Sequence, residues 1–278
     1  MAMRRTAPLA ALLMTVAGCS IQPAAPVAAP PPASVDALVR QLEQEETRAD
    51  ARNDLVALGA QGVPALLAHT RHRSAVVRWE LANVLGPVAD ARALPALVSN
   101  ATADENPHVR WRSLWALSHF EAQSVAEALR EQLRQEDEPT RWNAAVALSF
   151  FNIADGLDLI HSGVRNPDAW RRWEAINALG RIHDESSPDI LAQAVRSPAL
   201  GDRTEAVLSL GVIGGPKASA LLVGALEDPA SDVRWRACMA LGRIGDPATV
   251  PALQALDAVE RDPQVREQLR LALAKLAR

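Results

Sequence analysis

The chain has 278 residues, and its hydrophobic share of 49% is typical of a folded protein and excludes an intrinsically disordered chain. Its 29 basic and 33 acidic residues give a net charge of −4, which argues against a nucleic-acid partner. The apolar residues are mostly Ala, Leu and Val, with no Tyr, and this composition favours helices. No internal stretch approaches the roughly 20 apolar residues that a membrane-spanning helix needs.

Residues 1–18 have the pattern of a secretory signal peptide. Arg4 and Arg5 form a positively charged start, residues 7–16 are mainly apolar, and small residues follow. We expect this segment to be removed. The remaining chain then carries 27 basic and 33 acidic residues, a net charge of −6.

The sequence Val-Ala-Gly-Cys at residues 16–19 resembles the lipobox of bacterial lipoproteins. The resemblance implies cleavage before Cys19 and acylation of this cysteine, and several acyl chains such as palmitate would anchor the protein stably. Inner-membrane lipoproteins tend to carry Asp after the cysteine. Ser20 therefore favours the outer membrane, with the protein facing the periplasm. The alternative is an ordinary signal peptide in which Cys19 is incidental.

A Pro/Ala-rich segment, residues 21–34, follows the cysteine. Such a composition gives an extended, semi-rigid tether. We therefore divide the chain into a signal peptide (1–18), a lipidated cysteine with its tether (19–34) and a folded repeat domain (35–278). Once Cys19 is lipidated, Cys238 is the remaining cysteine, so an intramolecular disulfide is excluded.

A pattern of 12 residues recurs about every 31 residues, and its best copy, VRWRACMALGRI, occupies residues 233–244. Its arginine recurs at Arg78, Arg110, Arg141, Arg172, Arg203, Arg234 and Arg266. Eight residues after each arginine stands a small residue, namely Gly86, Ser118, Ser149, Gly180, Gly211, Gly242 and Ala274. A fixed period of this length predicts stacked supersecondary units rather than one closed core.

Each repeat contains two helical patterns. In the best copy, Val233, Ala237, Ala240, Leu241 and Ile244 fall within an arc of roughly 100° at 100° per residue, which is one apolar helix face. An N-cap followed by Pro is expected at Asn106–Pro107, Glu138–Pro139, Asn166–Pro167 and Asp262–Pro263. We predict an all-α solenoid of about eight helical pairs, at 35–59, 60–86, 91–119, 122–150, 155–181, 187–213, 216–245 and 247–277.

The segment DVRWRACMALGRIGDPATVPAL, residues 232–253, resembles the short HEAT-like repeat of the phycobilisome-lyase type, and the resemblance covers nearly all of residues 35–278. It implies that the arginine helix is the inner helix of each pair and lines a concave surface. Proteins with this repeat include bilin lyases and scaffolds, so the repeat indicates the fold and leaves the function open.

The repeated arginine lies about 100° around the inner helix, on its flank. One interpretation is an anion-binding stripe. The favoured one is a structural ladder between repeats, since an Arg fork can tie a neighbouring loop through charge-assisted hydrogen bonds, as in HEAT-type solenoids. The acidic residues expected as partners stand just upstream in most units, at Asp137, Asp168, Asp202, Asp232 and Asp262.

Tryptophan follows the repeated arginine in five units, at an angle of about 200° that points away from the partner helix. The candidate ligand-binding residues at this position and four residues further on are Trp79, Trp111, Trp115, Trp142, Trp173, Trp235 and Met239. Aligned repeats would make them one exposed aromatic stripe, and Trp is enriched at binding hot spots. The equally weighted alternative is that each indole packs on the adjacent repeat or on an arginine. Trp170 lies outside this register.

Signals for catalysis are weak. His69 and His72 have a spacing that can bind a metal but lack a third ligand, and no HExxH, GxSxG or phosphate-loop motif occurs. The chain also lacks the paired His-Glu dipeptides of HEAT-repeat hydroxylases. Cys238 occupies a position that other repeats fill with apolar residues, which favours packing over nucleophilic chemistry. We therefore expect no enzyme, no cofactor and no metal ion.

These patterns together predict an outer-membrane lipoprotein whose periplasmic solenoid binds a protein or an extended peptide of the cell envelope in its groove. The second interpretation is binding of an envelope glycan such as peptidoglycan through the Trp stripe. The third, a lyase-like maturation factor, would need polar groups that converge in the groove.

Overall fold

A computed structural model describes residues 34–182, 184 and 186–277 of the chain. The predicted signal peptide, Cys19 and all of the tether except Ser34 lie outside the described residues. The described part forms sixteen α-helices and three short 3-10 helices, and none of its residues is in a β-strand. Within this part, no helix is both long and apolar enough to cross a membrane.

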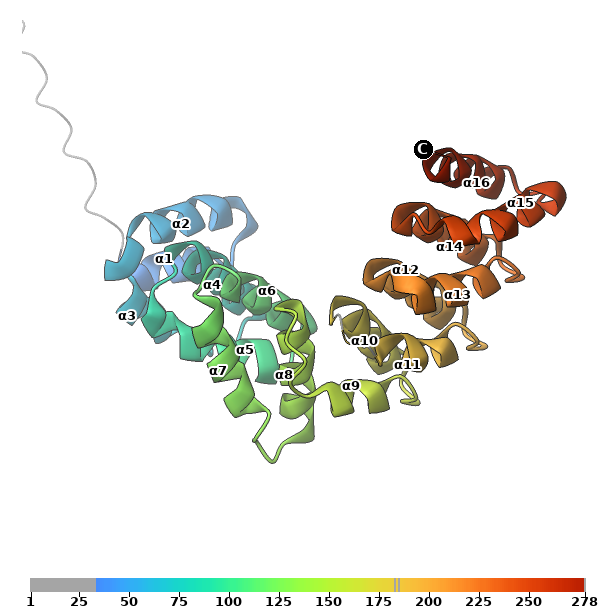
Figure 1. The fold of residues 1–278 in the computed structure, drawn as a ribbon. Coiled ribbons are helices and arrows are strands. Elements are labelled where there is room, and N and C mark those ends of the chain that lie inside the picture. Colours follow the sequence, from blue (N-terminus) through green and yellow to red (C-terminus); the bar gives the residue numbers. More distant parts are fainter. Residues whose placement is uncertain (1–33, 183, 185, 278) are drawn as a thin grey trace, which may run out of the picture. The chain divides into compact units, whose positions relative to one another are not determined.

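The α-helices are α1 (Val35–Gln41), α2 (Glu45–Ala57), α3 (Val63–Leu67), α4 (Ala75–Val88), α5 (Leu94–Ala103), α6 (Pro107–Leu117), α7 (Ala122–Gln132), α8 (Glu138–Phe150), α9 (Leu157–Gly163), α10 (Ala169–Arg181), α11 (Ser187–Ala194), α12 (Leu200–Ile213), α13 (Gly215–Ala225), α14 (Ser231–Ile244), α15 (Val250–Val259) and α16 (Pro263–Leu276). The 3-10 helices are Gly59–Gln61, Ala91–Ala93 and Pro247–Thr249. The odd-numbered α-helices are called outer and the even-numbered ones inner. The predicted α-solenoid of eight helical pairs is confirmed (Figure 1).

The helix starts match the predicted caps in two of four cases. The Asn106 side chain accepts hydrogen bonds from backbone amides at the start of α6, and the Asp262 side chain does so at α16. At α8 the cap is Asp137 and not Glu138, and at α10 it is Asp168 and not Asn166. Asp137 accepts from the Thr140 amide three residues on, and Asp168 does the same with Arg171, while Asn166 accepts from the Asp168 amide in the loop before α10.

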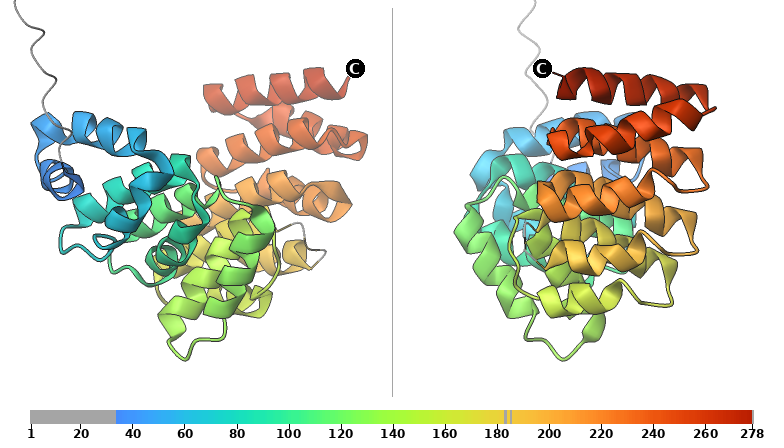
Figure 2. Two further views of the ribbon diagram at one scale, coloured as in Figure 1. Left: turned by 90° about the vertical axis from the view of Figure 1, so that its left-hand side faces the viewer. Right: turned by 45° about the vertical axis from the view of Figure 1, so that its right-hand side comes forward.

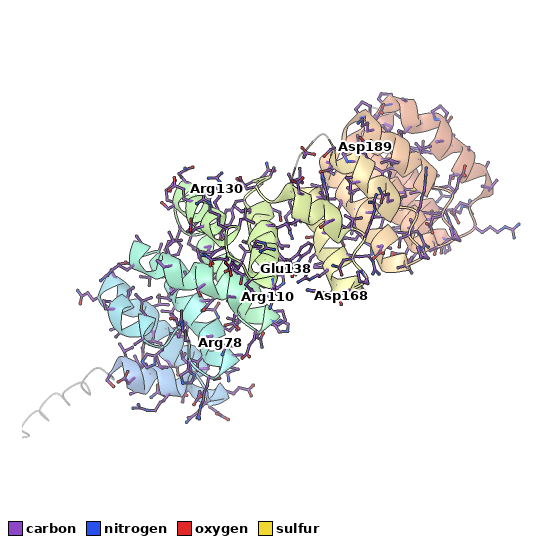
Figure 3. All side chains as sticks on the ribbon, turned by 90° about the horizontal axis from the view of Figure 1, so that it is seen from below. Arg78, Arg110, Arg130, Glu138, Asp168 and Asp189 are labelled. Carbon is purple, nitrogen blue, oxygen red and sulfur yellow. The ribbon has the colours of Figure 1, made fainter. Side chains whose placement is uncertain are left out.

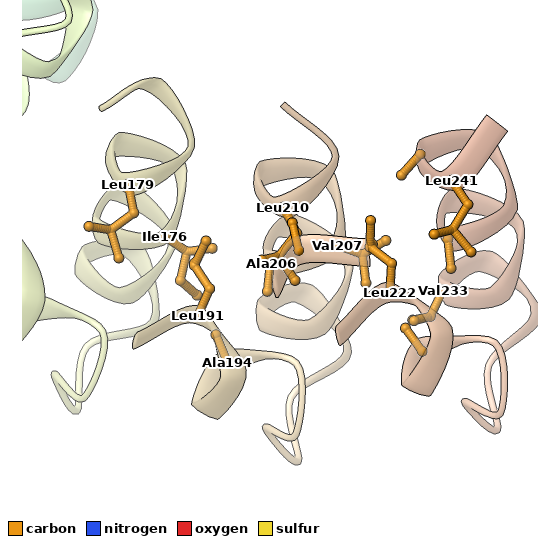
Figure 4. Packing of buried hydrophobic residues seen from close by; sticks show 14 of the residues in the cluster. Ile176, Leu179, Leu191, Ala194, Ala206, Val207, Leu210, Leu222, Val233 and Leu241 are labelled. Carbon is orange, nitrogen blue, oxygen red and sulfur yellow. The ribbon is translucent and has the colours of Figure 1, made fainter. Parts of the chain in front are cut away.

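Inner helices stack on one another in the C-terminal part, in the order α10, α12, α14 and α16, and the outer helices α11, α13 and α15 cover one side of this row (Figures 1 and 2). The interior between the two rows is apolar. Figure 4 shows Ile176, Val207 and Leu210 of the inner row close to Leu191 and Leu222 of the outer row, all fully buried. Leu241 of α14 is likewise 0% exposed, as its predicted core position requires.

The buried apolar residues form two clusters, one spanning α1–α8 and one spanning α8–α16. Helix α8 contributes to both. Trp142 and Val146 belong to the C-terminal cluster, whereas Ala147 and Leu148 belong to the N-terminal one. The solenoid therefore has two cores that meet at α8.

Glycine sets the distance between neighbouring inner helices at four interfaces. A β-carbon at Gly86 would lie 3.0 Å from the α-carbon of Ala116, and one at Gly211 would lie 2.7 Å from the β-carbon of Ala240. Gly180 against Ser209 and Gly242 against Ala272 repeat this arrangement, at 2.8 Å each. No side chain fits in so little space, so the repeated glycine allows close contact of α4 with α6, α10 with α12, α12 with α14, and α14 with α16.

Serine takes the place of this glycine at the two interfaces that involve α8. Ser118 ends α6 and is exposed, and α8 packs mainly across α5, α7 and α10 instead of on α6. Ser149 lies on α8, which packs less extensively on α10 than α10 does on α12. These two interfaces interrupt the regular stack.

Candidate binding surface

The repeated arginines tie each inner helix to the loop before it. In six of the seven arginines, Nη1 donates hydrogen bonds to the backbone carbonyls of the residues six and five positions earlier. Arg234, for example, donates to the carbonyls of Asp228 at 2.8 Å and Pro229 at 3.2 Å. Arg110 and Arg141 make the same pair of bonds, to Asp104 and Glu105 and to Gln135 and Glu136.

Four of these arginines also form an ion pair with a carboxylate of the next repeat. The rungs, from the arginine Nε to a carboxylate oxygen, are Arg78–Asp104 at 2.6 Å, Arg172–Asp202 at 2.9 Å, Arg203–Asp228 at 2.7 Å and Arg234–Glu260 at 2.7 Å. The guanidinium of Arg234, together with backbone amides of Arg261 and Asp262, lowers the pKa of Glu260 to about 2. Charge-assisted pairs of this kind hold neighbouring repeats in register.

The expected acidic partners are wrong except for Asp202. Asp137, Asp168 and Asp262 are occupied as helix caps, and Asp232 pairs with Arg236 on its own helix at 3.0 Å. The rung acids instead stand 25–30 residues after their arginine, because the arginine reaches forward to the next pair. Arg110, Arg141 and Arg266 have no carboxylate rung among the described residues. Figure 3 shows Arg78, which has a rung, and Arg110, which lacks one.

Trp142 contradicts the prediction of a continuous exposed stripe. Only 4% of this residue is exposed, and its indole N–H donates to the buried Glu174 at 2.9 Å. The guanidinium of Arg171 covers the ring at 5.2 Å from its centroid and pairs with Glu138 at 2.6 Å, which lowers the pKa of that carboxyl. Because α8 is turned into the second core, Trp142 is a packing residue.

The neighbouring tryptophans are half-buried. Trp173 donates its indole N–H to Glu205 at 3.0 Å, and the exposed Trp170 stacks on it with ring centroids 4.9 Å apart. Trp111 packs edge-on against Phe150 at 4.8 Å. Trp235 and Met239 lie half-buried on α14 in the regular stack.

Arg181 reaches from α10 to the aromatic pair of Trp111 and Phe150. Its guanidinium lies 3.6 Å from the Phe150 ring centroid and 5.9 Å from that of Trp111. Burial lowers the pKa of Arg181, while the negative charge of Glu205 opposes this effect. This contact joins three inner helices at the place where the stack is interrupted.

The most exposed candidate is Trp115, with 42% of its surface accessible. The guanidinium of Arg112 lies over its ring, at 4.8 Å from the centroid, and also over the ring of Trp79, at 4.6 Å. His119 contacts Trp115 edge-on at 4.6 Å between ring centroids. Beside Trp79 opens a mainly apolar recess of about 300 Å³ between α4 and α6, which Val76, Val109 and His108 also line. We call Trp79, Arg112, Trp115 and this recess the α4–α6 surface.

Sequence reasoning missed the arginines that cover the tryptophans. Arg112 follows Trp111 directly, so its place one residue past the Trp position was a readable signal. Arg181 follows the repeated Gly180, as Arg243 follows Gly242, so its position was also readable, whereas Arg171 and Trp170 lie outside the repeated pattern.

The candidate metal-binding and nucleophilic residues are engaged or buried within the described part of the chain. No group of three or more His, Cys, Asp or Glu residues among them could hold a metal ion. His69 binds Asp36 at 2.9 Å, while His72 accepts from the backbone amide of Ser74. Cys238 is 0% exposed and burial raises the pKa of its thiol to about 12, so it remains protonated and unreactive.

Comparison with known proteins gives the family. A profile of HEAT repeats matches residues 63–149, 126–211 and 201–274, which together span more than half of the chain. The chain belongs to the HEAT-repeat family. No curated protein sequence matches it significantly.

Similar solved structures support the fold. The Escherichia coli protein YibA is 20% identical and aligns over 88% of this chain and 93% of its own, with a TM-score of 0.54. Human deoxyhypusine hydroxylase in complex with glycerol is 25% identical over 87% of this chain and 96% of its own, with a TM-score of 0.40. An engineered protein is 20% identical over 88% and 78%, with a TM-score of 0.49. At these levels only the likeness to YibA carries weight, and it concerns the fold alone.

Proposed function

We propose that this HEAT-repeat solenoid is a non-catalytic scaffold that binds a protein or an extended peptide through the inner-helix face of its N-terminal half. HEAT repeats in general mediate protein interactions, which agrees with this role. The sequence further suggests anchoring through a lipidated Cys19 in the outer membrane, so that the partner would be a periplasmic protein of the cell envelope.

The observation that carries the proposal is the α4–α6 surface. Trp115 is 42% exposed, an apolar recess opens beside Trp79, and Val76 at the rim of the recess is 41% exposed. Large exposed aromatic side chains next to an apolar recess mark interaction sites because their burial by a partner is favourable. The binding surface is therefore smaller than the predicted stripe and excludes Trp142.

Binding of an envelope glycan is the second candidate. Trp170 is 49% exposed and lies nearly parallel to Trp173, with an angle of 27° between the rings. A flat exposed indole of this kind can stack on a sugar ring. Soluble peptidoglycan fragments that quench Trp fluorescence in the wild type and not in Trp170→Ala would favour the glycan.

Photocrosslinking in cells tests the scaffold proposal. A photoreactive phenylalanine at position 115 should give discrete crosslinked products with an envelope protein. The control places the same residue at Val259, which is apolar and 71% exposed on the outer helix α15. Products from position 259 and none from position 115 would contradict the proposed surface.

The anchor is tested separately. Metabolic labelling with a fatty-acid analogue should mark the wild type and leave Cys19→Ser unlabelled and uncleaved. A wild-type protein that takes up no label would contradict the lipoprotein proposal, while the binding proposal would stand.

A further inference from the structure

The Arg112 guanidinium contacts two indole rings at once. Its guanidinium carbon lies 4.6 Å from the ring centroid of Trp79 on α4 and 4.8 Å from that of Trp115 on α6. Arginine stacks well on aromatic faces, and in that position the N–H groups at its edge stay available for hydrogen bonds. The two rings therefore fix the orientation of the guanidinium without using its donors.

These donors are unused within the described part of the chain, where Arg112 forms neither a hydrogen bond nor an ion pair. Two comparable arginines differ from it. Arg171, which covers Trp142, binds both carboxylate oxygens of Glu138 at 2.6 and 2.9 Å. Arg236 stands at the equivalent position of its repeat, two residues after the repeated arginine, and pairs with Asp232 at 3.0 Å.

The charged groups that line the recess do not compensate the charge of Arg112. Glu80 lines the recess, but it is 1% exposed and is engaged by Arg52 at 3.3 Å and by the Asn83 amide at 3.1 Å. Arg48, which also lines the recess, donates to the backbone carbonyls of Leu42 and Glu43. The α4–α6 surface is therefore positively charged on a chain of net negative charge.

We propose that Arg112 is the anchor point for a carboxylate of a bound peptide, with an adjacent aliphatic side chain of the peptide entering the recess beside Trp79. The planar fork of a guanidinium matches the two oxygens of a carboxylate. The recess, lined by Val76, Trp79 and Val109, supplies an apolar contact beside Trp79, one of the two rings over which Arg112 lies. This inference rests on the proposed function and names the chemistry of its partner, namely an Asp or Glu side chain or a C-terminal carboxylate.

A random-heptapeptide library with free C-termini, selected on the full chain, supplies the probe. Peptides enriched on the wild type should carry an acidic residue, or a free C-terminus, next to an aliphatic residue. Resynthesis with Asn or Gln for the acid, or with a C-terminal amide, should weaken binding about tenfold or more in fluorescence anisotropy, and it distinguishes the two carboxylate sources.

Three variants connect this effect to Arg112. Arg112→Gln should lose the preference for the acid and bind about tenfold more weakly, and Arg112→Lys should fall in between because an ammonium group neither stacks nor binds two oxygens. Arg236→Gln, the matched control, should bind within about twofold of the wild type. Thermal melts of all three verify folding.

Each contrary result is informative. Peptides that bind Arg112→Gln as tightly as the wild type, or whose neutral versions bind equally well, would overturn the assignment of Arg112 and leave the scaffold in place. A wild type that enriches no peptide would overturn the carboxylate-anchor proposal, while the scaffold proposal would stand or fall with the crosslinks at position 115.

Discussion

From α10 to α16 each inner-helix interface combines a glycine with a rung from the repeated arginine, whereas the steps from α6 to α8 and from α8 to α10 have neither. In the first region Gly180, Gly211 and Gly242 allow close packing, and three rungs join successive repeats. In the second region Ser118 and Ser149 replace glycine, and Arg110 and Arg141 bind only backbone carbonyls. The interface of α4 with α6 returns to the regular kind, with Gly86 and the Arg78–Asp104 rung.

The difference shows how a repeat protein makes one region distinct. Where the glycine and the rung are both present, successive inner helices pack closely and are joined by ion pairs. The surface then has the same pattern in each repeat. Where both are missing, α8 turns onto α5, two cores form, and aromatic side chains gather around α6, α8 and α10. The exposed Trp115 stands one turn from Ser118, at the edge of this interruption.

The largest loss of stability is expected when the buried Trp142 is replaced, in contrast to the exposed Trp115. Trp142→Ala should leave a cavity in the C-terminal core and an unpaired Glu174, at a cost of roughly 3–5 kcal/mol in the free energy of unfolding. Trp115→Ala should cost roughly 0.5 kcal/mol or less, since 42% of this residue is exposed and its indole makes no hydrogen bond in the described part of the chain. Denaturant unfolding measures both. Similar losses in the two variants would mean that Trp115 also has a packing role.

A smaller change in stability is expected when a glycine between two inner helices is replaced by alanine. Gly211→Ala brings a β-carbon to 2.7 Å from that of Ala240 and should destabilise the stack by about 2 kcal/mol. Gly224 on the outer helix α13 has no atom within 4 Å of such a β-carbon, so Gly224→Ala should stabilise by up to about 1 kcal/mol through helix propensity. Melts of the two variants should move in opposite directions. A stabilising Gly211→Ala would refute the role of glycine in spacing.

The rungs should add a pH-dependent contribution of about 1–2 kcal/mol each. Because Arg234 lowers the pKa of Glu260 from 4.5 to about 2, the stabilisation is present above pH 4.5 and is lost as the pH falls towards 2. The difference in melting temperature between wild type and Glu260→Gln should therefore be constant near neutral pH and shrink over that range. Glu136→Gln, at an exposed residue without a rung, should show no such difference. A pH-independent effect of Glu260→Gln would contradict the ion pair as its source.

The period of about 31 residues was enough to predict the eight helical pairs and the core face, because both depend on spacing within one repeat. The interruption at α8 was not predicted. Ser118 and Ser149 were visible as departures from glycine, but their consequence depends on how α8 packs against the rest of the chain.

The ion-pair rungs, too, could not be predicted from sequence spacing alone. Glu136 stands 26 residues after Arg110, the spacing of Arg78–Asp104 and Arg234–Glu260, yet its side chain makes no ion pair with Arg110. Sequence spacing places an acid near the right loop, while the packing of the next helix decides whether the two groups meet. The burial of Trp142 follows from that same packing, so the predicted stripe was wrong at this position.

Hydrogen–deuterium exchange along the full chain tests most directly the claim that α8 divides the solenoid. A uniform solenoid frays at its ends and is most protected in the middle. If α8 divides the solenoid, protection should instead reach a local minimum at α8 (Glu138–Phe150), between better protected amides in α4 and in α12. A profile with a single central maximum that includes α8 would contradict the claim.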